Sequence, residues 1–135
     1  MRRVALVMAA VAVLGAGGLI AARHDEKQKQ EAVKELAARD IAEKLDGKEA
    51  KATTVVVTLD AGQESAPHRH PGPTFGYVLE GEYEWGIDDQ PTKVLKAGET
   101  FYEPTGCQHR VSRSPAGATG RTRVLAILLQ PRDAK

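Results

Sequence analysis

Three histidines stand at spacings that can bring their side chains onto one ion. His68 and His70 are separated by one residue, so on a strand both imidazoles leave the same face, roughly 6–7 Å apart at the backbone. His109 lies in a second stretch of short strands and turns, and a neighbouring strand can supply its imidazole as a third ligand. A divalent metal accepts imidazoles that converge in this way. The sequence therefore predicts a metal site inside a β-barrel.

The first histidine-bearing segment runs from Gly62 to Gly81. Five residues separate Gly62 from His68, one separates His68 from His70, three lead on to Thr74, and six more lead to Gly81. This spacing resembles the first motif of the cupin superfamily. In that family the position of Thr74 usually carries a glutamate that is a metal ligand. Every position of the motif is kept here except that glutamate.

The second segment resembles the second cupin motif. Five residues separate Gly98 from Pro104, and Gly106 and His109 follow at the family spacing. The family's asparagine four positions later is Arg113 in this chain. The two motifs in order imply a small single-domain bacterial cupin, a jelly-roll β-barrel that covers roughly residues 53–130. They also imply three metal ligands: His68, His70 and His109.

The remaining pattern of this region is that of an all-β fold. Thr53–Leu59 is rich in β-branched residues, and Glu82–Ile87 alternates, with Tyr83 and Trp85 on one face. Frequent short strands separated by turns predict a sandwich or a barrel, and the cupin resemblance selects the jelly roll. Further strands are expected around His68 and Thr74 and at Thr92–Leu95, Thr100–Glu103, His109–Ser112 and Arg123–Leu129.

Glu103 offers a way to replace the charge that is missing at Thr74. It shares strand parity with Phe101, and in cupins the residue before the second-motif proline tends to face the barrel interior. A buried carboxylate without a partner is costly, so an inward Glu103 argues for a nearby cation or for a protonated carboxyl. With a cation present, Glu103 is expected to be a metal ligand or a general base. It is the candidate catalytic residue. The alternative is that the strand end turns Glu103 to solvent.

Two functional classes follow from these residues and from the resemblance. Cupins that use only histidines include dioxygenases that act on thiols and β-diketones, which implies a mononuclear metal-dependent dioxygenase. The alternative is a non-catalytic module that binds a small molecule or a metal. The divalent cation can be iron(II), zinc, manganese or nickel. An apolar cavity for a small organic ligand is expected, although core packing alone also explains its candidate lining residues: Val78, Tyr83, Trp85 and Phe101.

Residues 1–23 predict a signal peptide or a membrane anchor. Arg2 and Arg3 precede an apolar run of 19 residues from Val4 to Ala22. That run is longer than the ~7–15 residues of a signal-peptide core and close to the ~20 that span a bilayer. Cleavage and retention in the inner membrane both stay open. Either one places the barrel in the periplasm or elsewhere outside the cytoplasm.

Residues 24–50 are expected to form a charged helical linker in front of a cupin domain at residues 51–131. Three acid-before-base pairs stand four residues apart, and an apolar stripe runs from Val33 to Leu45. Gly47 would end the helix. A spacer, a cover for the barrel and a solvated linker are the three roles left open for it.

Composition limits the partners. The chain has 135 residues and a formal net charge of +1, which gives no electrostatic reason to expect nucleic acid binding. Its one cysteine, Cys107, excludes an intramolecular disulfide. A barrel of about eighty residues buries only a small core, so a homodimer is expected. The remaining expected partner is a small molecule.

Overall fold

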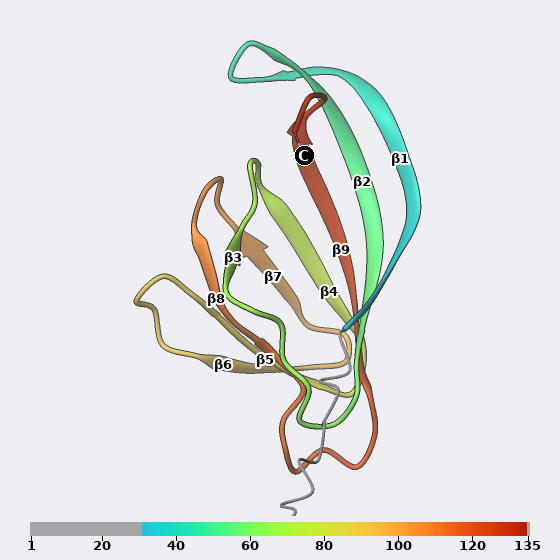
Figure 1. Ribbon diagram of the computed structural model, residues 1–135, viewed down its shortest axis with the longest axis vertical. Helices are drawn as coiled ribbons and strands as arrows, with labels where there is room; N and C mark the ends of the chain where they lie inside the picture. The colour runs from blue at the N-terminus through green and yellow to red at the C-terminus, as the bar shows by residue number, and fades with distance from the viewer. Residues whose placement is uncertain (1–30, 135) are drawn as a thin grey trace, which may run out of the picture.

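The computed structural model describes residues 31–134, which form two antiparallel β-sheets facing each other (Figure 1). The larger sheet has the strand order β1-β2-β9-β4-β7, and the smaller sheet has the order β3-β8-β5-β6. Residues 31–134 contain no helix. The strands are β1 (Ala32–Leu45), β2 (Lys48–Leu59), β3 (His68–Arg69), β4 (Thr74–Glu80), β5 (Glu82–Ile87), β6 (Lys93–Lys96), β7 (Thr100–Glu103), β8 (Gln108–Arg113) and β9 (Thr122–Pro131).

The predicted all-β jelly roll is confirmed, and each strand expected from Thr53 onward has a counterpart. Two of them are longer than expected: β2 begins at Lys48, and β9 continues to Pro131. Turn glycines join the strands. Gly81 links β4 to β5 with φ of +77°, and a Cβ there would stand 2.6 Å from the carbonyl oxygen of Arg121. The position therefore requires glycine.

The helix predicted within residues 24–50 is wrong for the part that the structure describes. Ala32–Leu45 form strand β1, which pairs with β2 along its length. Ion pairs four residues apart add only about 0.2–0.5 kcal/mol each to a helix. Pairing with β1 satisfies the backbone groups that β2 would otherwise expose along its edge. A spacing of four is also a multiple of the strand period of two, so the apolar stripe did not exclude a strand.

The turn between β1 and β2 carries the signal that favours a hairpin. Asp46 and Gly47 form a two-residue connection in which both have positive φ, 51° and 77°. Asp-Gly is the preferred dipeptide for such turns, because its backbone twist matches that of the two flanking strands. Gly47 is therefore a hairpin glycine, and not the end of a helix.

The predicted signal peptide or anchor, residues 1–23, lies outside the described residues, and so do residues 24–30 of the predicted linker. Within residues 31–134 there is no helix with the length and apolarity needed to cross a membrane.

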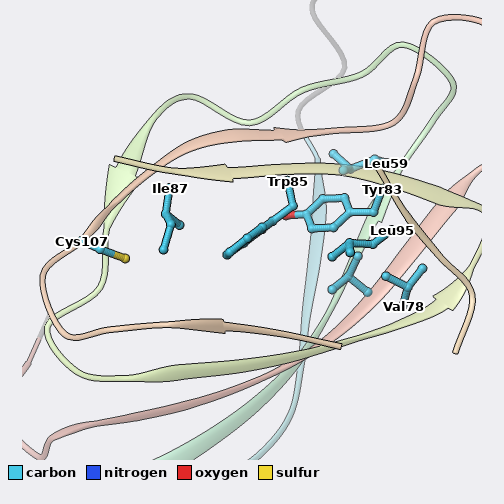
Figure 2. Packing of buried hydrophobic residues seen from close by; sticks show 8 residues of the cluster. Leu59, Val78, Tyr83, Trp85, Ile87, Leu95 and Cys107 are labelled. Atoms are coloured by element: carbon cyan, nitrogen blue, oxygen red, sulfur yellow. The ribbon is translucent and has the colours of Figure 1, made fainter. Parts of the chain in front are cut away.

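The core lies between the two sheets and is built around aromatic rings. Phe101 stacks near both Tyr83 and Trp85, with ring centroids 5.6 Å apart in each pair. Gly76, its partner on β4, makes room for it, because a Cβ there would stand 1.9 Å from the Phe101 ring. Figure 2 shows how the aliphatic side chains extend this packing on either side of the rings. The buried cluster comprises Leu59, Val78, Tyr83, Trp85, Ile87, Leu95, Cys107 and Val124.

Candidate metal centre

The pairing of two short strands brings the three histidines together. His68 on β3 lies directly opposite His109 on β8, and His70 follows the end of β3. The ring centroids of His68 and His70 are 4.8 Å apart, and those of His68 and His109 are 5.0 Å apart. Each ring offers one nitrogen within 4.8 Å of the others. The three histidines therefore converge as predicted, and their arrangement suggests a metal site. Three imidazoles do not determine which divalent ion binds there.

Hydrogen bonds orient two of these rings. Nδ1 of His68 lies 2.8 Å from the carbonyl oxygen of Ala66, which can only accept. Nδ1 therefore carries the proton, and Nε2 keeps a free lone pair, as in histidines that bind metals. The hydroxyl of Tyr83 lies 3.3 Å from Nε2 of His109. Nδ1 of His109 is buried and has no hydrogen-bond partner among the described residues.

Burial keeps the inner imidazoles neutral. It lowers the pKa of His109 to about 3, and the neighbouring His68 and His70 add to this effect. Burial, followed by the charge of His68, also lowers the pKa of His70. A metal binds the neutral form of histidine. At neutral pH these two rings can therefore bind a cation without first losing a proton.

Glu103 faces the interior, so the alternative in which it turns to solvent is wrong. Its side chain is 1% exposed, and Oε1 accepts a hydrogen bond of 3.0 Å from Nε1–H of Trp85. Oε1 lies 3.1 Å from Nδ1 of His109, and Oε2 lies 3.4 Å from Nε2 of His70. Burial raises the pKa of Glu103, an effect that the bond from Trp85 and the charge of His68 partly offset.

Thr74 and Glu103 are direct partners across β4 and β7. Opposite residues in an antiparallel pair project from the same face of the sheet, and both of these side chains are buried. Thr74 occupies the position at which the cupin motif usually has its glutamate. This chain thus carries its buried carboxylate one strand away from that position and on the same face.

Three buried polar atoms at this place have no hydrogen-bond partner within residues 31–134: Oγ1 of Thr74, Oε2 of Glu103 and Nδ1 of His109. The last two lie at ion-pair distance from His70 and from Oε1 of Glu103, but those contacts do not form hydrogen bonds. Leaving one such atom unsatisfied costs about 1–3 kcal/mol. Such groups in a native protein require an explanation, and an ion is one of the usual ones. Oxygen and nitrogen lone pairs gathered beside neutral imidazoles fit a divalent cation.

A cavity of about 200 Å³ lies against the histidines. Tyr83 and Phe101 line it, as predicted, but Trp85 and Val78 do not; both are buried in the core cluster. Its polar lining comes from both sheets: His68, His109, Tyr83 and Ser112 from the smaller sheet, Thr53, Thr74, Glu103 and Gln130 from the larger sheet, and Glu31, Ser65 and His70 from outside the strands. The aliphatic lining comes from β1, β2 and β9 of the larger sheet: Val33, Val55, Val57, Val124, Ala126 and Leu128.

The sequence did not point to a row of hydroxyls along this cavity. The hydroxyl of Tyr83 lies 2.8 Å from Oγ of Ser112, which lies 3.2 Å from Oγ of Ser65. Ser65 in turn donates to the carboxylate of Glu31. Ser65 lies between strands, and Glu31 directly precedes β1, so no strand or helix periodicity connects them. Of the residues in this row, the sequence indicated only Tyr83, through the alternation of polar and apolar residues along β5.

An antiparallel two-sheet barrel with three histidines beside an interior cavity is the architecture of a small ligand-binding or metal-binding barrel. The family model for the cupin domain matches residues 55–127, more than half of the chain. The chain belongs to the cupin family. No functionally curated protein matches it.

Solved structures of similar fold include proteins with and without a known activity. An uncharacterized conserved protein with a double-stranded β-helix domain from Klebsiella pneumoniae is 20% identical (TM-score 0.59), over 79% of this chain and 82% of that one. The DMSP lyase DddQ from Ruegeria pomeroyi is 22% identical (TM-score 0.60), over 78% of this chain and 49% of the lyase. Iron(II) HppE in complex with substrate is 21% identical (TM-score 0.50), over 57% and 45%. The chain thus spans about half the length of each of these two enzymes, and the likeness shows the fold.

Proposed function

We propose that this chain is an exported metal-dependent cupin that acts on a small organic molecule, with oxidoreductase chemistry of the dioxygenase type. The observation that carries the proposal is the group of three buried polar atoms without hydrogen-bond partners, set at the three imidazoles and beside a cavity. The iron(II) of HppE, which has a similar fold, is compatible with it.

Each residue of the centre has a role in this proposal. His68, His70 and His109 hold a divalent cation. Oε2 of Glu103 is either a fourth ligand or the atom that accepts a proton from the substrate, and Trp85 fixes the carboxylate through Oε1. The aliphatic side chains of the larger sheet provide an apolar surface for the body of the substrate. When bound, the cation supplies Lewis acidity or, as iron(II), reactivity toward dioxygen.

The test starts with the metal content of protein purified without a histidine tag. We expect about one divalent ion per chain, and we expect that ion to be lost from His68→Ala, His70→Ala and His109→Ala while the barrel still folds, since a three-ligand open site is not structural. Two of these three variants retaining full occupancy would show that the site is misassigned. Oxygen uptake with diketone, thiol and phenolic substrates then tests the reaction.

The second candidate is a non-catalytic module that binds a metal or a small molecule. The observation that favours it is Thr74, because a neutral hydroxyl at the usual glutamate position is also what a cupin without catalysis would carry. Tight binding of a ligand without turnover or oxygen uptake would support this candidate over the enzyme.

We propose further that the barrel works outside the cytoplasm, after cleavage or anchoring of residues 1–23. The basic start and the long apolar run support this location. A reporter that is active only in the cytoplasm, fused after Lys135, should be silent. Activity of that reporter would contradict export.

A homodimer is proposed as the assembled state. The outer face of the larger sheet exposes Phe75, Tyr77 and Leu79 of β4 beside Tyr102 of β7 and Ile127 of β9. A cluster of exposed apolar side chains on one sheet face is a common interaction surface, and β7 is an edge strand that a second copy can pair with. The mass in solution, by light scattering, should halve in Tyr102→Glu. A monomeric wild type would contradict the dimer.

A further inference from the structure

We propose that the cavity selects a small molecule with one anionic oxygen group and a compact, branched aliphatic body, and that it rejects dianions and cations. This inference rests on the metal site proposed above and adds the chemical class of the ligand. The size of the cavity, the kinds of side chain that line it and the charges around it each support the assignment.

The size of the cavity limits the ligand. A volume of about 200 Å³ lies below the roughly 300–1,000 Å³ of pockets for drug-sized molecules. A short-chain organic acid fits such a space, whereas a nucleotide or a fused-ring compound does not.

The aliphatic lining determines the body of the ligand. It consists of valines at 33, 55, 57 and 124 with Ala126 and Leu128, none of which can form a hydrogen bond, and it is interrupted on the same sheet by Thr53 and Gln130. Apolar surface of the ligand gains about 25 cal/mol for each Å² that this lining removes from water. Branched methyl groups suit a surface made mostly of valines, because close packing rewards matching shapes.

The polar lining determines the reacting group of the ligand. Thr74 is 2% exposed and lines the cavity, and its Oγ1 has no hydrogen-bond partner among the described residues. The hydroxyls of Tyr83 and Ser112 line the same cavity from the smaller sheet. A ligand oxygen bound at the cation can accept a hydrogen bond from such a hydroxyl. The threonine at the glutamate position thus supplies a donor that a carboxylate there could not provide.

The charges of the lining decide between monoanion and dianion. Within residues 31–134 the charged side chains that line the cavity are Glu31 and Glu103, and no lysine or arginine lines it. A divalent cation together with both glutamates brings the lining to zero net charge, so one ligand carboxylate is held by direct binding at the cation. A second carboxylate would lack a positive partner and would lie in a cavity that already holds Glu31, and an unpaired charge in such a place is costly. An ammonium group would be repelled by the cation.

A matched set of probes tests this selectivity by calorimetry on the zinc-loaded full chain. Isovalerate is the expected ligand, 3-methylbutanamide is its neutral analogue, isopropylmalonate adds a second carboxylate, and isopentylamine carries a positive charge. We expect isovalerate to bind at least tenfold more tightly than the malonate or the amine, and more weakly after zinc is removed. Equal or tighter binding of isopropylmalonate would overturn the assignment.

Two phenylalanine substitutions on neighbouring residues of β9 test whether isovalerate binds in the cavity. Ala126 faces the cavity, and its neighbour Ile127 is exposed on the outer face of the same strand. We expect Ala126→Phe to lower the affinity for isovalerate at least tenfold without changing the zinc stoichiometry, and Ile127→Phe to change neither. If Ala126→Phe does not fold, Ala126→Val replaces it. On the wild type, diphenylacetate should not bind, since it exceeds the cavity. Undiminished binding to a folded Ala126 variant would overturn the assignment.

The zinc content separates this inference from the proposed function. Protein that binds no zinc contradicts both. Protein that binds one zinc but does not distinguish isovalerate from the dianion contradicts only the ligand class.

Discussion

The interior of this barrel has two regions that use the same strands differently. On β4, Val78 belongs to the packed core, whereas Thr74 at the other end lines the cavity. On β5, Trp85 bridges the two regions, because its ring packs on Phe101 while its N–H donates to Glu103. The first region is filled with apolar atoms, and the second is hollow and contains buried polar atoms without partners.

The difference shows which region stabilises the fold and which is available for chemistry. In the filled region each side chain contacts others closely, so removing atoms leaves a cavity that the surroundings cannot close. In the hollow region the unsatisfied atoms of Thr74, Glu103 and His109 already cost stability. A protein retains such a cost where the groups serve function.

The largest expected effect comes from emptying the filled region. Leu59 is fully buried in the core cluster, so Leu59→Ala should lower the free energy of unfolding by about 2–5 kcal/mol. Its metal stoichiometry should not change. Denaturant unfolding and metal analysis of the same samples measure both quantities.

The matched control is Leu79→Ala, the same truncation at a position on β4 that is 40% exposed on the outer face. It should change the unfolding free energy by less than about 1 kcal/mol. The comparison of the two regions would fail if Leu59→Ala removed metal while leaving stability intact.

The second largest effect is expected from pH, because the buried histidine of the hollow region makes the free energy of unfolding depend on pH. In metal-free protein the pKa of His109 is held at about 3, below its unfolded value of about 6.5. The unfolded chain therefore binds more protons in this range, and stability falls as the pH falls. Between pH 7 and pH 5 His109 alone contributes a loss of about 2 kcal/mol. His70 acts in the same direction, because its pKa is also lowered.

Glu103 opposes this loss. Its raised pKa means that the ionised carboxylate destabilises the fold, and this cost is relieved as the pH falls through the folded pKa. Glu103→Gln should therefore make the decline in unfolding free energy with falling pH steeper than in the wild type, at pH values above the carboxyl's ordinary pKa. A decline that is equal or shallower in the variant would show that Glu103 carries no such strain.

The motif spacings predicted the barrel and the convergence of the histidines because the turns and strand lengths between Gly62 and His109 fix how far apart the side chains lie. Strand parity also predicted that Glu103 faces inward. The segment before β2 was not predictable in the same way, since the i,i+4 pairs and the apolar stripe of residues 32–45 are compatible with either structure. Its strand conformation depends on pairing with β2, which is a tertiary contact.

The polar row along the cavity was not predictable either. Ser65, Ser112 and Glu31 come from a loop, a strand and the residue before β1, and they meet only in the folded chain. A single serine in the sequence gives no periodic pattern from which one could tell whether its hydroxyl faces a cavity or the solvent. The Asp46-Gly47 turn was the one local signal that would have corrected the helix prediction.

The smallest expected effect is that of moving the carboxylate across the sheet. Thr74 and Glu103 are partners on β4 and β7, so a glutamate at either position projects from the same face toward the histidines. Glu103→Gln alone should weaken metal binding roughly 10–100-fold, whether the carboxylate is a ligand or orients one. Glu82→Gln, at an exposed position on β5, is the control and should have no effect.

Adding Thr74→Glu to Glu103→Gln places the charge where the cupin motif usually has it. The double variant should recover metal affinity to within about tenfold of the wild type, a difference of about 1.4 kcal/mol. The recovery should be incomplete, because Trp85 donates to the carboxylate at position 103 and cannot satisfy a glutamine there equally well. Metal dissociation constants of the wild type and the three variants decide it. If Glu103→Gln binds metal like the wild type, the carboxylate takes no part in the site, and the hollow region works through its histidines alone.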